Sequence, residues 1–115
     1  MPGSFRSALT ALKERSLEAA AKTFINRQIE GMGRLTRLDI DSSKRAIQAE
    51  LDLRGEPAPI VVNVGAYDLT AAGGISYIIL REVSSSKEWV TALLKRYLVG
   101  RNLQVPQVVW IALQP

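Results

Sequence analysis

Residues 33–54 have the sequence GRLTRLDIDSSKRAIQAELDLR, in which apolar and polar side chains alternate. In its second half, the apolar positions are separated by Gln48, Glu50 and Asp52. This period of two is typical of a strand with one buried face and one solvated face. Residues 41–44 are turn-forming, so the stretch predicts an antiparallel hairpin. One face of the first strand is expected to carry Met32, Arg34, Thr36, Leu38 and Ile40.

Two further strands are expected after the hairpin, over residues 60–69 and 75–83. Residues 55–59 contain two prolines, which cannot donate to a strand ladder, so they are expected to connect strands rather than extend them. Both later strands carry apolar side chains on both faces, and such strands are normally covered on both sides. Residues 33–83 therefore predict an antiparallel meander of four strands.

Helices are expected on either side of the sheet in the sequence, over residues 4–30 and 86–99. Ser85 and Glu88 have the spacing of a capping box at the start of the second helix. The apolar tail, residues 103–113, is expected to form a strand, and a short helix beginning at Pro106 is the alternative. The chain of 115 residues is thus predicted to be one α+β domain over residues 1–115, with a long N-terminal helix, the meander, a second helix and a C-terminal strand or short helix.

The long helix contains a break in its apolar pattern. Its first stripe includes Phe5, Leu9 and Leu12. A second stripe lies about 130° away around the helix axis. Either the helix bends near residues 14–16, or its first turns pack against something other than this domain's core. The second stripe consists of Leu17, Ala20, Ala21, Phe24 and Gln28.

The chain has no cysteine and no histidine. Thiolate nucleophiles, imidazole bases, His-based triads and Cys/His zinc sites are therefore excluded, and we expect a protein that is not an enzyme and needs no cofactor. No secretory pattern is visible in the sequence, which favours a cytoplasmic location.

The net charge of +4 belongs entirely to residues 1–37, so a weak attraction to anionic membranes is expected there. The candidate cations are Arg6, Lys13, Arg15, Lys22 and Arg27.

Two patterns in the sequence resemble functional sites without meeting their requirements. Asp39, Asp41 and Glu50 match part of a calcium loop, but Lys44 stands where the sharp turn needs glycine. The carboxylates also form pairs two residues apart on solvated strand faces, where cross-strand ion pairs with Arg37 and Lys44 are the expected role. Nucleic-acid binding is not expected, because the aromatic residues lie in apolar stripes away from the cations.

Several segments together resemble a family of small bacterial proteins with no assigned activity. These segments are residues 33–41, residues 51–60, Tyr67, residues 86–89 and residues 105–106. The architecture of a long helix followed by two-faced strands is also similar to half of a tubular lipid-binding module. That second resemblance implies that a dimer could complete a tube.

The supply of apolar residues exceeds what one helix–sheet layer covers. Either the C-terminal tail covers the excess as part of a well-filled core, or the surplus marks a partner or a ligand. The leading hypothesis is a self-associating interaction module, a dimer, whose interface candidates are Phe5, Leu9, Leu12, Val61, Ile78 and Leu80. The alternative is a domain that binds an apolar ligand or lipid in a groove near Trp89 and Trp110, with the cationic first helix on the membrane.

Overall fold

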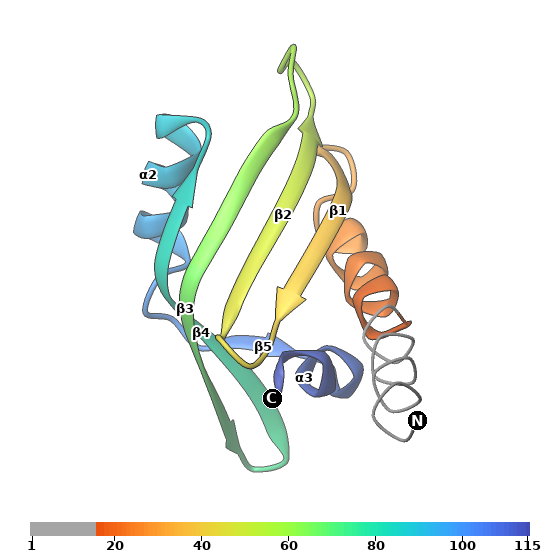
Figure 1. Cartoon of the computed structure of the whole chain (residues 1–115), viewed down its shortest axis with the longest axis vertical. Coiled ribbons are helices and arrows are strands. Elements are labelled where there is room, and N and C mark those ends of the chain that lie inside the picture. The colour runs from red at the N-terminus through yellow and green to blue at the C-terminus, as the bar shows by residue number, and fades with distance from the viewer. Residues whose placement is uncertain (1–15) are drawn as a thin grey trace, which may run out of the picture.

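The computed structural model describes residues 16–115 and confirms the α+β fold (Figure 1). A helix whose described part covers residues 16–28, here called the N-terminal helix, precedes the sheet. Phe5, Arg6, Leu9, Leu12, Lys13 and Arg15 lie outside the described residues. The later elements are β1 (Gly33–Asp41), β2 (Ala46–Leu53), β3 (Ile60–Ala72), β4 (Ile75–Ser85), α2 (Glu88–Tyr97), β5 (Leu103–Val105) and α3 (Gln107–Leu113).

The five strands form one antiparallel sheet in the order β1-β2-β3-β4-β5. β5 pairs only with the beginning of β4, through Ser76–Ile78. Register shifts interrupt the long β3–β4 pair near Ala66, and shifts of this kind increase the local twist of a sheet. The sheet is curled, and the chain from β5 to α3 returns below the ends of β1 and β2 (Figure 1).

The two faces of the curled sheet differ in character. The inner face carries the core, with Leu35, Val64 and Tyr67 among its buried side chains. The N-terminal helix contributes Ala21 and α3 contributes Leu113 to the same core. The outer face carries charged side chains, described below. The alternation predicted for β2 is confirmed, since Ile47, Ala49 and Leu51 all pack against the core.

β1 departs from the face predicted for it. Leu35 is 1% exposed and Leu38 is 8% exposed, whereas Met32 is 59% exposed. A register shift between Leu35 and Arg37 causes the difference, because an extra residue in one strand reverses the alternation on either side of it. The prediction that Met32, Arg34 and Thr36 share a face with Leu38 was wrong for this reason.

The predicted capping box of α2 was also wrong. Ser85 pairs with Val62 as the last residue of β4, and the residue at the N-cap of α2 is Lys87. The Ser85 hydroxyl donates instead to the Lys87 carbonyl over 2.6 Å. In the tail, both alternatives occur in succession, since β5 is followed by α3 with Pro106 at the N-cap.

One buried hydrogen bond joins α3 to the sheet. The Tyr67 side chain is 1% exposed, and its hydroxyl donates to the Leu113 carbonyl oxygen over 2.7 Å. Burial raises the pKa of the Tyr67 hydroxyl above the usual 10.0. The bond fixes the C-terminal helix over the inner face of β3.

We expect Tyr67→Phe to lower the free energy of unfolding by about 1–2 kcal/mol, because the Leu113 carbonyl loses its donor. The raised pKa means that ionisation opposes folding, so this contribution is complete below about pH 10 and is lost as the pH rises further. Urea denaturation at about pH 8 and pH 11 measures both effects. The difference in stability between the two proteins should shrink at the higher pH, and a constant difference would contradict the assigned role.

Candidate functional site

The curled sheet encloses an apolar cavity of about 360 Å³, here called the inner cavity. Seventeen of the described residues line it, and all but Gln28 and Gln104 are apolar. They come from the N-terminal helix, all five strands and α3, together with Leu98 just after α2. The cavity is therefore lined by residues from most elements of the domain.

The two glutamines identify the opening of the inner cavity. Both line the cavity and both are exposed to solvent, which places them where the cavity meets water. No ionisable side chain is among the lining residues. A polar group of a ligand would meet amide donors and acceptors at the opening, and the remainder would meet only hydrocarbon and backbone.

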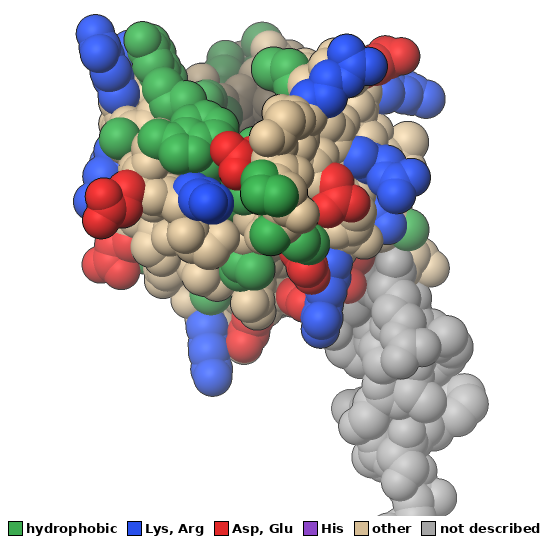
Figure 2. Space-filling model, turned by 90° about the horizontal axis from the view of Figure 1, so that it is seen from above, with side chains coloured by type: hydrophobic (Ala, Val, Ile, Leu, Met, Phe, Trp, Pro, Cys, Tyr) green, Lys and Arg blue, Asp and Glu red, His purple; other side chains and the backbone are tan. Residues whose placement is uncertain are grey.

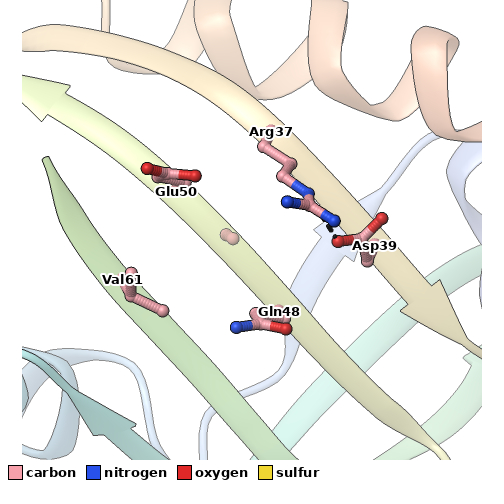
Figure 3. A pocket seen from close by; sticks show the side chains of 6 residues that line it. Arg37, Asp39, Gln48, Glu50 and Val61 are labelled. Carbon is pink, nitrogen blue, oxygen red and sulfur yellow. Dashed lines mark hydrogen bonds and ion pairs between the residues drawn. The ribbon is translucent and has the colours of Figure 1, made fainter.

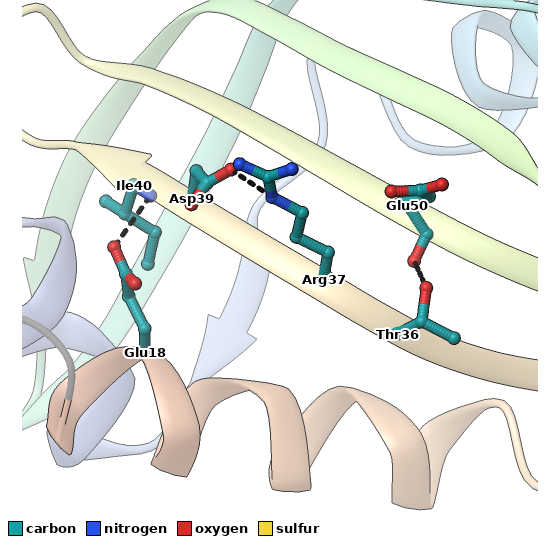
Figure 4. Close-up of polar contacts among 6 residues, drawn as sticks. All are labelled: Glu18, Thr36, Arg37, Asp39, Ile40 and Glu50. Carbon is teal, nitrogen blue, oxygen red and sulfur yellow. Dashed lines mark hydrogen bonds and ion pairs between the residues drawn. The ribbon is translucent and has the colours of Figure 1, made fainter.

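Side-chain bonds to the free edge of β1 hold the N-terminal helix beside the cavity. The Asn26 side chain accepts from the Leu35 backbone N–H over 2.6 Å and donates to the Leu35 carbonyl over 3.2 Å. Near the other end of the strand, the Glu18 carboxylate accepts from the Ile40 backbone N–H over 3.0 Å (Figure 4). These bonds substitute for a neighbouring strand and keep Phe24 of the helix in the cavity wall.

The bonds made by Asn26 and Glu18 were missed in the sequence. A usable signal existed, since an edge strand always presents unpaired backbone groups and a polar residue beside an apolar helix stripe can reach them. The second stripe itself was predicted well, because Ala21 is buried, Phe24 is half-buried, and Gln28 lies at the opening of the cavity.

The outer face of β1 and β2 is a charged surface with a small polar pocket of about 70 Å³ (Figure 3). Arg37 donates to the Asp39 carboxylate over 2.9 Å within the same strand, and Glu50 lies opposite Arg37 in the register. Further along the sheet, Arg81 and Asp68 form an ion pair of 2.7 Å. These exposed pairs contribute little to stability. Of the carboxylates for which cross-strand pairs were predicted, Asp39 is paired, but with Arg37 of its own strand.

The middle of the apparent calcium pattern forms the turn between β1 and β2, whereas Asp39 and Glu50 lie on those strands. The Asp41 carboxylate accepts from the Ser43 hydroxyl over 2.7 Å and from the Lys44 backbone N–H over 3.3 Å. These hydrogen bonds lower the pKa of Asp41 below its usual value. Within residues 16–115, no group of three or more carboxylates gathers as a metal site would require.

The interface candidates within the described chain are divided between the two faces. Ile78 is 7% exposed and Leu80 is half-buried, and both line the inner cavity. Val61 is half-buried beside the polar pocket of the outer face. Ile78 and Leu80 thus contribute to the cavity wall, and neither presents a broad surface to a second copy.

The groove and membrane candidates also lie apart from one another. Trp110 is half-buried against the core, Trp89 is exposed on α2, and neither lines the inner cavity. On the N-terminal helix, Lys22 is half-buried and Arg27 is exposed. The structure therefore does not bring these four residues together in one site.

No protein-family model, curated protein or solved structure matches the chain. This agrees with the resemblance to a family without an assigned activity, whereas similarity to a lipid-binding module is not shown. None of the helices in residues 16–115 combines the length and apolar character needed to cross a membrane.

Proposed function

We propose that this domain is a binding protein that takes an apolar ligand into the inner cavity, and that it is not an enzyme. The observation that carries the proposal is a space of about 360 Å³ in which fifteen of the seventeen lining residues are apolar. Ligand sites are typically concave, mostly apolar and equipped with a few polar groups that orient the ligand.

The size of the inner cavity separates it from an ordinary packing defect. Protein interiors are close-packed, with few voids larger than a water molecule. An engineered apolar cavity of roughly 150 Å³ stays dry and binds benzene, and the inner cavity at about 360 Å³ is more than twice as large. An uncharged molecule of two fused rings, or a medium-length hydrocarbon chain, fits this space and chemistry.

Self-association, the leading hypothesis from the sequence, has less support. Ile78 and Leu80 lie in the cavity wall, and Phe5, Leu9 and Leu12 are outside the described residues. Native mass spectrometry of freshly purified protein separates the two functions. An added mass that matches one bound small molecule supports ligand binding, whereas a dimer without added mass favours self-association.

Substitution of Ala49 tests the cavity directly. Ala49 lies on β2, faces the inner cavity and has room beside it for a larger side chain. We expect Ala49→Phe to weaken binding of the uncharged fluorescent probe N-phenyl-1-naphthylamine by roughly tenfold or more, because the ring occupies the space of the probe. Fluorescence titration measures the affinity.

The stability of Ala49→Phe gives a second, independent result. Filling a true void should raise the free energy of unfolding by about 0.5–2 kcal/mol, whereas overpacking a filled core would lower it by about 1–3 kcal/mol. The matched control is Ala46→Phe, which adds the same ring to the outer face of the same strand and should leave probe binding unchanged. Equal probe binding by Ala49→Phe and the unmodified protein would refute the proposed site.

A further inference from the structure

α2 presents an apolar stripe that its own domain leaves uncovered. Trp89, Leu93 and Tyr97 are 47%, 47% and 52% exposed, and their spacing of four residues places them on one face of the helix. Val90, which is buried, and Leu94, which packs against the core, fix the helix to the domain through a different face. Three large exposed side chains in a row mark a surface for interaction.

Arg96 borders this stripe, and the other cations of residues 87–101 lie on another side of α2 or beyond its ends. Residues 87–101 contain four cations and one acid, Glu88, for a net charge of +3, and the Lys87 ammonium is partly offset by Glu56 at 3.9 Å. The Arg96 guanidinium lies 5.4 Å from the centre of the Tyr97 ring. On the left of Figure 2, the side on which α2 lies in Figure 1, hydrophobic side chains lie next to Lys and Arg side chains, with Asp and Glu side chains on the same side. The cations are Lys87, Lys95, Arg96 and Arg101.

We propose that α2 docks on an anionic lipid surface. Trp89, Leu93 and Tyr97 enter the boundary between headgroups and acyl chains, while Arg96, next to Tyr97, contacts the lipid phosphates. Helices with Trp or Leu on one face and Lys or Arg beside it bind in this manner, and Trp and Tyr favour the membrane interface. Each cation near an anionic surface adds to the attraction. This assigns membrane contact to α2, whereas the sequence had suggested the N-terminal helix.

The charges favour lipid over a second copy of the chain. A two-fold dimer would use the same patch on both subunits, so the cations of one α2 would approach those of the other. Such like-charge contacts oppose association, whereas an anionic surface is complementary to the patch. α3 provides a contrast within the same protein, because Val108 and Ile111 are exposed on a helix without any charged residue.

The proposed surface adjoins the inner cavity. Leu98, which follows Tyr97 directly, lines the cavity. A membrane-docked α2 would therefore hold one wall of the cavity close to the bilayer. The docking inference goes beyond the proposed ligand binding and does not require the cavity to hold a ligand.

Co-sedimentation with two kinds of vesicle tests the inference. We expect the full chain to bind vesicles that contain phosphatidylglycerol, to bind pure phosphatidylcholine vesicles weakly, and to dissociate as salt is added. Trp89→Ser combined with Leu93→Ser should weaken binding by roughly tenfold or more, because the inserted apolar area is lost. Val108→Ser combined with Ile111→Ser is the matched control and should bind normally.

The charge component has its own pair of variants. Arg96→Gln should reduce the preference for anionic vesicles, whereas Arg34→Gln makes the same charge change elsewhere and should retain it. Absence of binding to anionic vesicles would overturn the inference. The inference would also be overturned if Lys22→Gln combined with Arg27→Gln abolishes vesicle binding while the α2 variants bind normally. The N-terminal helix would then be the surface that contacts the membrane. The inference would also be overturned if the protein is a dimer and Trp89→Ser combined with Leu93→Ser dissociates that dimer, because a second copy would then cover α2.

Discussion

Asn26→Leu is expected to lower the free energy of unfolding by about 2–4 kcal/mol, although the substitution keeps the size and shape of the side chain. The reason lies in Leu35, whose backbone N–H and carbonyl both bond to the Asn26 amide at a partly buried position. The leucine side chain offers neither group, so two backbone groups of the edge strand lose their partners together. Chemical denaturation monitored by circular dichroism measures the loss.

Thr23→Ala provides the comparison for Asn26→Leu on the same helix. Thr23 is exposed, and its hydroxyl bonds only to the Ala19 carbonyl one turn earlier. Its removal should change the stability by less than about 0.5 kcal/mol. If Asn26→Leu lowered the stability as little as Thr23→Ala does, water would be replacing the two hydrogen bonds. The position of the helix would then not depend on the bonds between Asn26 and Leu35.

Gly33→Ala should cost about 2–3 kcal/mol, because a methyl group at this position meets the backbone of the next strand. An added Cβ would lie 2.9 Å from the Leu53 Cα and 2.8 Å from the Leu53 Cδ2, and it would also collide with the Asp52 carbonyl oxygen. Since two of these atoms are backbone, the first pair of the β1–β2 ladder must separate. Thermal unfolding gives the size of the effect.

Gly65 offers a matched glycine in the same sheet. A Cβ at Gly65 would approach only the Glu82 side chain, at 3.1 Å from its Oε2 atom, and that carboxylate can rotate away. Gly65→Ala should therefore range from neutral to a gain of about 1 kcal/mol, since alanine restricts the unfolded chain. Equal losses for the two variants would show that backbone contact at Gly33 is not the cause.

The sequence was most informative where one pattern determined the structure. The alternation through Ile47, Ala49 and Leu51 predicted β2 and its buried face, and residues 55–59 ended the hairpin as expected. The pattern failed at β1, where a single extra residue between Leu35 and Arg37 reversed the faces. A prediction from apolar periodicity assumes a regular strand. It cannot detect a bulge, because a bulge depends on how the strand pairs with its neighbour.

The candidate site was less accessible from the sequence for a different physical reason. The large side chains Trp89 and Trp110 were chosen as groove residues, but a cavity is formed where side chains are too small to fill a space. Ala21 lines the inner cavity from the N-terminal helix, and Ala49 lines it from β2. Neither residue is unusual in an element of its kind. Only the curvature of the sheet, which follows from its register shifts, leaves the space between them open.

The two outer strands of the sheet are protected in different ways, and the consequence concerns aggregation. β5 is three residues long and leads directly to Pro106, which has no N–H to offer to a neighbouring chain. β1 is nine residues long and relies on Asn26 and Glu18 of the helix beside it. Release of that helix would uncover a long strand edge, a template for strand addition, at the same moment as the apolar wall behind it. The N-terminal helix thus protects the long edge of β1 from pairing with a neighbouring molecule.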